Sequence, residues 1–345
     1  MTPSENRPLI WSGSYTADSG GHGAGIGAIS VASDGTLAWQ GTAVKAESPS
    51  FISVHPTLPL VYAVGESTQT VRAYRRRGEF GLEAARDPWP AGEAACHVAV
   101  DPQGRFLVVA CWGDGQVLLY ELDNDGGITA RFPAAPSMDP HDGGRPSRAH
   151  ASLMLADGRI MTTDLGHDLL RVWNYVPGSG LSQDHEVVLP KDSGPRHLVQ
   201  HPDGTVFVVS EYSIELFTVR TGSGTTQFEL VGQGPATAGG AQEGDSAAEI
   251  ALSPDGNHAY VGVRGSNRIC VLQVDGELGQ LRPLMDYPSG GDWPRHHLVR
   301  DCWLHIAHER SHDVTTFRLD PESGLPGEVH HRLVAGSPTA LAVAS

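Results

Sequence analysis

Short apolar runs alternate with tight polar turns along the whole chain. The stretch "HLVQHPDGTVFVV" (residues 197–209) shows the pattern, in which one apolar segment, the turn Pro-Asp-Gly and a second apolar segment follow one another. In such a turn Pro presets φ, Asp bonds its own backbone and Gly accepts a positive φ. No segment of useful length has the 3.6-residue periodicity of an amphipathic helix. The pattern therefore predicts an all-β protein built from hairpins.

Seven copies of this hairpin follow one another at a nearly constant spacing. Their second residues are separated by 47, 53, 47, 52, 47 and 43 residues. This spacing is typical of the four-stranded blades of a β-propeller. The second residues of the seven copies, in chain order, are Ser50, His97, His150, His197, Glu249, His296 and Thr339.

The seventh copy contains one strand only, whereas residues 8–45 contain three apolar segments without an opening strand. We expect the C-terminal strand, within residues 337–345, to complete the blade that residues 8–45 begin. Closing the ring in this way leaves no unpaired sheet edge. The fold class predicted is all-β: a seven-bladed β-propeller of four-stranded blades, formed by residues 1–345 as a single domain.

The acidic composition limits the partners that the protein binds. Forty acidic against 24 basic residues give a formal net charge of −16, which repels the phosphate backbone of nucleic acids. No apolar run reaches the roughly 18 residues that span a bilayer, and the N-terminus lacks the pattern of a secretory signal. Four scattered cysteines indicate reduced thiols. We expect a cytoplasmic monomer or weak homodimer that binds neither nucleic acid nor membrane.

Hairpin geometry gathers the unusual residues at one end of the ring. The first strand of each blade lines the central channel, and its start lies beside the end of the second strand. Both therefore face the same mouth, while the Pro-Asp-Gly turns face the other. The starts carry His97, His150, Arg196, His197, Glu249, Arg295, His296 and His297, and the ends carry Glu66, Trp112, Asp164, Glu211, Arg264 and Glu309. The sequence predicts a site at this mouth.

Each of these groups also has a purely structural interpretation. A histidine repeated at one blade position is explained equally by a hydrogen bond to the neighbouring blade, and the arginines by ion pairs with Glu211, Glu249 and Glu309. "DLGHD" (residues 164–168) is typical of a turn. The Gly- and Pro-rich loop 138–149 either covers the mouth or is a simple insertion.

A metal site is a further interpretation of the mouth, because several histidines together with Glu249 offer ligands suited to zinc. No H-E-x-x-H or comparable local pair exists, however, and nearby arginines would repel a cation. We therefore expect no metal and no other cofactor.

These repeats resemble the lactonase-type seven-bladed propeller family, which contains the propeller 6-phosphogluconolactonases and the fungal-type carboxymuconate cycloisomerases. The resemblance covers nearly the whole chain and rests on stretches such as "GPRHLVQHPDG" with "SEYS", "AAEIALSPDG" with "VRG", and "GSYT" near the start. It implies an active site at the predicted mouth. The functional positions that it implies are His150, Arg196, Glu211 and Arg264.

The sequence also departs from the family pattern at the mouth. The family often has His-x-His where this chain has Arg148-Ala149-His150, and Asn-Tyr where it has Cys111-Trp112. Two further differences, "HER" (residues 308–310) and Pro294-Arg295-His296, lie in blade six. The scaffold is therefore kept while the pocket is altered.

Three functions are compatible with these residues. The favoured one is metal-independent hydrolysis of a lactone that carries an anionic group. The base is His150 or Glu211, and Arg196 with Arg264 stabilises the oxyanion or holds an anion. The substrate-binding candidates are His97, Trp112, Arg148, His197, Arg295 and His296.

The second function is a cycloisomerase that forms or opens a muconolactone-like ring with the same residues. Its substrate is an unsaturated carboxylate. The third is a non-catalytic propeller that binds a ligand or a protein partner, because fold alone does not decide function.

Overall fold

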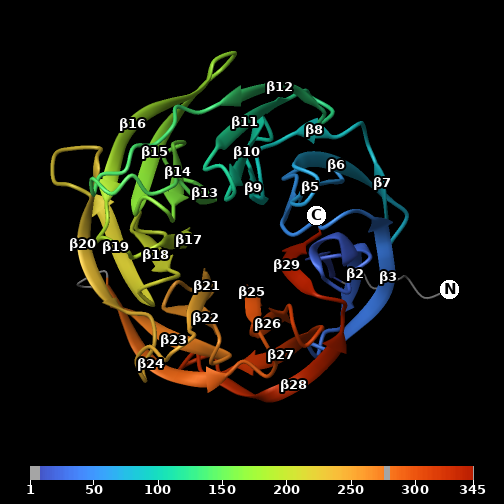
Figure 1. The fold of residues 1–345 in the computed structure, drawn as a ribbon. Coiled ribbons are helices and arrows are strands. Elements are labelled where there is room, and N and C mark those ends of the chain that lie inside the picture. Colours follow the sequence, from blue (N-terminus) through green and yellow to red (C-terminus); the bar gives the residue numbers. More distant parts are fainter. Residues whose placement is uncertain (1–7, 276–279, 345) are drawn as a thin grey trace.

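A computed structural model describes residues 8–275 and 280–344 as seven antiparallel sheets arranged in a ring (Figure 1). The predicted propeller is confirmed. Each sheet is one blade, and its innermost strand lies beside the central channel. Apart from one short 3₁₀ helix, η1 (Ala17–Ser19), the regular structure in the described residues consists of strands.

The first three blades are formed from strands in chain order. Blade one contains β4 (Ile52–Val54), β5 (Leu60–Gly65), β6 (Thr70–Arg77), β7 (Gly81–Ala84) and β8 (Trp89–Pro90). Blade two contains β9 (Ala95–Val100), β10 (Phe106–Cys111), β11 (Val117–Leu122) and β12 (Ile128–Pro133). Blade three contains β13 (Ala149–Met154), β14 (Ile160–Asp164), β15 (Leu169–Val176) and β16 (Gly180–Val188).

Blades four to six repeat the arrangement. Blade four contains β17 (Pro195–Gln200), β18 (Val206–Ser210), β19 (Glu215–Thr221) and β20 (Phe228–Pro235). Blade five contains β21 (Ser246–Leu252), β22 (His258–Arg264), β23 (Arg268–Asp275) and β24 (Gln280–Pro288). Blade six contains β25 (Pro294–Arg300), β26 (Trp303–His308), β27 (Asp313–Leu319) and β28 (Pro326–Val334).

Blade seven closes the ring, as the sequence predicts. Its strands are β29 (Pro338–Val343), β1 (Leu9–Ser14), β2 (Gly25–Val31) and β3 (Leu37–Lys45), in this order from the channel outward. The C-terminal β29 pairs antiparallel with the N-terminal β1, with Trp11 opposite Ala342. The two ends of the described chain are therefore held together by one strand pair.

Blade one differs slightly from the expected four strands. Its outer strand is divided into β7 and β8, which pair with opposite ends of β6. Pro88 lies in the gap between them, and a proline has no N–H to contribute to a sheet ladder.

Apolar side chains between adjacent sheets hold the blades together. Between blades two and three, for example, Phe106, Val108 and Leu119 pack against Ile160 and Trp173. Each such side chain, when fully buried, contributes about 1.5–3 kcal/mol. No helix in the described residues is long and apolar enough to cross a membrane. The four cysteines are free thiols.

A β-bulge interrupts the pairing of the two inner strands in six of the seven blades. In blade four, Pro195 pairs with Ser210 and His197 with Val209, so Arg196 is the extra residue. In blade six the extra residue is Arg295. A bulge re-aims the side chains next to it, and here it lies at the predicted mouth.

Candidate active site

The same backbone hydrogen bond places a side chain at the mouth in six blades. Its donor is the N–H of the residue that follows the second strand, and its acceptor is the carbonyl of a residue that leads into the innermost strand. The N–H of Glu211, for example, donates to the carbonyl of Gly194 at 2.8 Å, and that of Glu309 to Trp293 at 3.1 Å. The residues fixed in this way are Tyr15, Glu66, Trp112, Leu165, Glu211 and Glu309.

The bulges explain why Arg-His occurs twice at the start of a strand. Because the bulged residue is not paired, two consecutive side chains both reach the centre of the ring. Arg196 contacts Glu211 at the mouth, whereas His197 contacts Glu249 deeper in the channel. Arg295 and His296 repeat this division of contacts in blade six.

Arg196, Glu211 and Arg264 form one charged cluster across blades four and five. Nε of Arg196 lies 2.8 Å from Oε2 of Glu211, and Nη2 of Arg264 lies 3.0 Å from the same oxygen. The other oxygen of Glu211 accepts a hydrogen bond from Oγ of Ser246 at 3.1 Å. Ser246 also accepts one from Arg264 at 2.6 Å, and Arg196 donates to the carbonyl of Ala248.

The charges in this cluster shift one another's pKa values. Burial raises the pKa of Glu211, but the guanidinium groups of Arg264 and Arg196 more than offset this and hold it below its usual range. Burial and the charge of Arg196 lower the pKa of Arg264 to about 10. Glu211 is therefore an ionised counter-charge at neutral pH, with both oxygens already engaged.

A second charged cluster lies where blades six, seven and one meet. Nη2 of Arg295 donates to the hydroxyl of Tyr15 at 2.7 Å, and that hydroxyl donates to the carboxylate of Glu66 at 3.0 Å. Nη1 of Arg295 lies 3.4 Å from Oε2 of Glu309. Burial, opposed by the charge of Arg295, raises the pKa of Tyr15, so its hydroxyl keeps its proton.

Below the two clusters, aromatic rings from four blades meet in the channel. The ring of Phe51 lies 4.2 Å from that of His97, 6.2 Å from His197 and 5.7 Å from His296, between ring centroids. His97 and His197 are themselves 5.4 Å apart. These ring contacts join blades one, two, four and six.

Glu249 joins two of these histidines. Its carboxylate oxygens lie 3.1 Å from Nε2 of His197 and 3.8 Å from Nε2 of His296. Burial raises the pKa of Glu249 well above the usual range of a carboxyl group. Burial also lowers the pKa of His197 well below the usual range of a histidine. Burial, with nearby cationic groups, lowers the pKa of His296 to about 3. For each of these three groups the shift favours the uncharged form.

Some of the histidines also make contacts with a neighbouring blade. Nδ1 of His97 lies 3.3 Å from Oγ of Ser152, and Nδ1 of His296 accepts from the N–H of Leu341 at 3.3 Å. Nε2 of His297 lies 3.1 Å from the carbonyl of Tyr260 in blade five.

His150 lies buried beside the first cluster and is less engaged. Its Nδ1 has no hydrogen-bond partner among the described residues. Burial and the charge of Arg196 lower its pKa well below the usual range, so the imidazole is neutral at pH 7 and able to accept a proton.

Aromatic side chains stacked with arginines form the rim of the mouth. The guanidinium of Arg148 lies 4.4 Å from the ring centre of Trp112, and it donates to the carbonyl groups of Trp112 and Gly113. Arg264 of blade five and Arg310 of blade six lie 5.4 and 3.3 Å from the ring centre of Trp293. Trp112 is 40% exposed.

Comparison of the chain with known protein families confirms the resemblance. The family described as "Lactonase, 7-bladed beta-propeller" matches residues 9–343. The chain belongs to this family. The 6-phosphogluconolactonase of Bacillus subtilis (strain 168) is 23% identical over 291 residues, which cover 82% of this chain and 83% of that protein.

Two solved structures share the lactonase-family fold. A protein from Lactobacillus plantarum has a TM-score of 0.89 at 22% identity, covering 98% of this chain and 99% of its own. The periplasmic gluconolactonase of Pseudomonas aeruginosa has a TM-score of 0.86 at 22% identity, with the same coverage. At these identities the likeness shows the fold alone.

Within this lactonase-family propeller, the loop 138–149 is tied to the body of blade three. Arg145 pairs with Asp139 at 2.8 Å and with Asp168 at 2.6 Å. Asp168 is fully buried and also accepts from Oγ of Ser193 and the N–H of Gly194. Asp164 accepts from Oγ of Ser147 and the N–H of Arg148. The "DLGHD" turn therefore anchors the loop.

The mouth contains residues that the sequence did not single out. Tyr15 lies in the "GSYT" stretch, but nothing in the sequence indicates that it reaches Arg295. Ser246 precedes the blade-five repeat, and Phe51 occupies a position that is apolar in most copies. Among residues 8–275 and 280–344, no three His, Cys, Asp or Glu side chains are placed to hold a metal ion together.

Proposed function

We propose that the protein hydrolyses a lactone that carries an anionic group, without a metal ion, at the mouth formed by Arg196, Glu211 and Arg264. The observation that carries the proposal is the shared oxygen of Glu211, which holds two guanidinium groups side by side. Membership of the lactonase family supports the reaction class, and the name of the Bacillus subtilis relative supports a sugar lactone.

The chemistry requires a base for water and a stabiliser for the oxyanion. His150 is the proposed base, because it is neutral and its Nδ1 is free. As water attacks the carbonyl carbon, its proton passes to His150 and the carbonyl oxygen becomes an oxyanion. Collapse of the tetrahedral intermediate then breaks the ring C–O bond, and His150 returns the proton to the leaving oxygen. The product is a hydroxy acid.

The arginines supply the electrostatic part of this mechanism. Arg196 is the proposed oxyanion donor, with Arg264 beside it, because a fixed guanidinium needs no reorganisation as charge develops. Glu211 orients both groups rather than acting as the base, since two cations hold its pKa low and Ser246 occupies its other oxygen. Arg295, whose side chain is 16% exposed, adds a third guanidinium to the mouth.

The test is turnover by protein treated with EDTA on a panel of lactones that includes 6-phosphogluconolactone. Acid release is followed in a pH-stat, and product analysis accompanies it. Metal-independent acid release, lost in Arg196→Lys and kept in Arg220→Lys on the outer part of the same blade, supports the proposal.

Other outcomes of this test identify the alternatives. Turnover of an unsaturated carboxylate to a lactone without consumption of water identifies a cycloisomerase, for which the exposed Trp112 offers a surface for an unsaturated substrate. A ligand that raises Tm without conversion identifies a binding propeller. Either result overturns the hydrolase.

A further inference from the structure

Trp293 adopts a backbone conformation that a bulky residue rarely takes. Its φ is +67°, in the left-handed region, which is unfavourable for a residue with a Cβ. The equivalent positions of blades four, one, two and seven, Gly194, Ser48, Ala94 and Ser337, also have a positive φ, between +37° and +67°. The conformation is therefore a feature of the repeat, and blade six is the blade that places an indole ring on it.

Hydrogen bonds hold Trp293 in that conformation. Its N–H donates to Oδ1 of Asn267 at 2.8 Å, and its carbonyl accepts from the N–H of Glu309 at 3.1 Å. The second bond is the one that fixes Glu309 at the mouth. The indole ring is thus attached to the frame that sets the position of the site.

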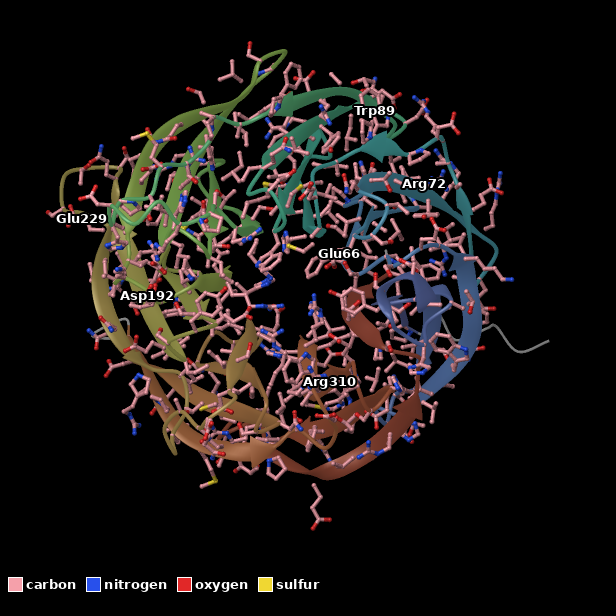
Figure 2. All side chains as sticks on the ribbon, in the orientation of Figure 1. Glu66, Arg72, Trp89, Asp192, Glu229 and Arg310 are labelled. Carbon is pink, nitrogen blue, oxygen red and sulfur yellow. The ribbon has the colours of Figure 1, made fainter. Side chains whose placement is uncertain are left out.

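The exposed side chain of Arg310 lies over the indole ring of Trp293. The guanidinium of Arg310 lies 3.3 Å from the ring centre, and the buried Arg264 lies 5.4 Å from it. Contact of this kind between a guanidinium and the face of an indole ring is favourable, because the ring face is electron-rich. Figure 2 shows Arg310 over the inner strands of blade six, nearer the centre of the ring than Glu229 or Arg72.

Arg310 differs in its charge environment from the arginines inside the mouth. Arg196 and Arg264 share Glu211, and Arg295 faces Glu309. No ion pair joins Arg310 to a carboxylate in the part of the chain that the structure describes. Since Glu66 adds a third carboxylate against three inner guanidinium groups, the inner mouth has little net charge, and Arg310 supplies an uncompensated cation at its edge.

We propose that Arg310, seated on Trp293, binds the anionic group of the substrate that lies farthest from the lactone ring. This inference rests on the proposed hydrolase and deepens it. The chemistry recognised is a phosphate or a carboxylate on the end of a lactone, because a guanidinium binds either by two parallel hydrogen bonds. Arg310 is therefore a residue that sets specificity, and Trp293 positions it.

The test compares lactones that differ only in the distal group. Arg310→Gln is measured on 6-phosphogluconolactone, on a glucarate-derived lactone with a terminal carboxylate, and on neutral gluconolactone. KM for the charged substrate that the enzyme uses is expected to rise about tenfold or more, with kcat within about twofold. KM for the neutral lactone is expected to stay unchanged. The charged lactone whose KM rises shows whether the site binds a phosphate or a carboxylate.

Matched variants separate recognition from folding. Trp293→Gly introduces into blade six the glycine that blade four has at this position, and glycine accepts the left-handed conformation without strain. We therefore expect Tm to stay within a few degrees, while KM for the charged substrate still rises. Arg318→Gln, an exposed arginine on β27 of the same blade, is the control for loss of one surface charge. Equal effects of Arg310→Gln on charged and neutral lactones, or no effect on either, overturn the inference.

A binding measurement keeps this inference distinct from the hydrolase. Calorimetry with 6-phosphogluconate, glucarate and gluconate, the corresponding product acids, needs no turnover. Weaker binding of 6-phosphogluconate or glucarate in Arg310→Gln, with binding of gluconate unchanged, supports the anion site even if no lactone is hydrolysed. Unchanged binding of both 6-phosphogluconate and glucarate overturns it even if hydrolysis is found.

Discussion

Nε of Arg196 lies 2.8 Å from Oε2 of Glu211, across the two inner strands of one blade. The β-bulge at Arg196 turns its side chain toward the mouth, and the bond from the N–H of Glu211 to Gly194 fixes the carboxylate opposite it. Each of the two charges is thus oriented by backbone geometry before any ligand binds. Arg264 of the next blade then completes the cluster on the same oxygen.

Arg196→Lys is expected to lower kcat/KM for a lactone substrate by about 100-fold or more, since loss of one oxyanion donor has an effect of this size. Lysine keeps the charge that faces Glu211 but has no planar fork, so Tm is expected to change by only a few degrees. Steady-state kinetics and thermal denaturation measure the two effects. Near-normal kinetics in this variant would remove Arg196 from the mechanism.

Glu211→Gln is expected to destabilise the fold by about 2–4 kcal/mol. The change leaves Arg196 and Arg264 facing one another without a counter-charge, and breaking a buried pair in this way is costly; a fifth of the Glu211 side chain is exposed, which moderates the loss. Urea unfolding gives the value.

A second substitution checks the cause of that loss. Adding Arg264→Met to Glu211→Gln removes one of the two uncompensated cations and is expected to recover part of the stability. If the double variant is as unstable as the sum of the two single variants, charge repulsion is not the cause.

The buried histidines are expected to make the fold sensitive to acid. Burial and the charge of Arg196 lower the pKa of His97 to about 3, and burial with neighbouring cationic groups lowers that of His296 to about 3. Between the ordinary histidine pKa of about 6.5 and these values, the unfolded chain binds protons that the folded chain does not. The contribution of these histidines to the free energy of unfolding is therefore fully present above about pH 6.5, and it is lost as the pH decreases toward 3.

Proton binding limits how steeply the free energy of unfolding changes with pH. Each such histidine contributes a slope of at most about 1.4 kcal/mol per pH unit. His97→Gln is expected to reduce the slope of unfolding free energy between pH 6 and 4, whereas His330→Gln, which changes an exposed histidine, is expected to leave it unchanged. Equal slopes in the wild type and in His97→Gln would contradict the assignment.

The loop 138–149 is expected to behave as an anchored segment. Arg145→Met removes the pairs with Asp139 and Asp168, and amide hydrogen exchange in residues 139–145 is expected to become faster. Because Asp168 also accepts from the N–H of Gly194, which leads toward Arg196, activity is expected to fall modestly as well. Exchange that is the same in both proteins would show that these pairs do not hold the loop.

The repeat made most of the architecture predictable. Ring closure by residues 337–345 and the mouth that gathers Arg196, Glu211 and Arg264 follow from hairpin geometry, because each copy of the repeat reports the same local structure. Hairpin geometry also places His150 at this mouth, and the resemblance added the expectation that it is a functional residue. Contacts between blades were not predictable in this way, since they depend on how the sheets turn against one another.

Three residues show what the pattern leaves out. Tyr15 joins Arg295 across a separation of 280 residues, and Phe51 meets histidines of three other blades. Trp293 occupies the left-handed position that Gly194 takes in blade four, and Arg310 lies over its ring. None of these side-chain contacts has a local signal in the sequence, because each depends on how strands and turns meet in the closed ring.

The four rings around Phe51 come from blades one, two, four and six. Blades that are not neighbours around the ring therefore share contacts at its centre. A shift of one blade is passed to the others through the same aromatic rings, so the propeller is held together at its axis as well as along its circumference.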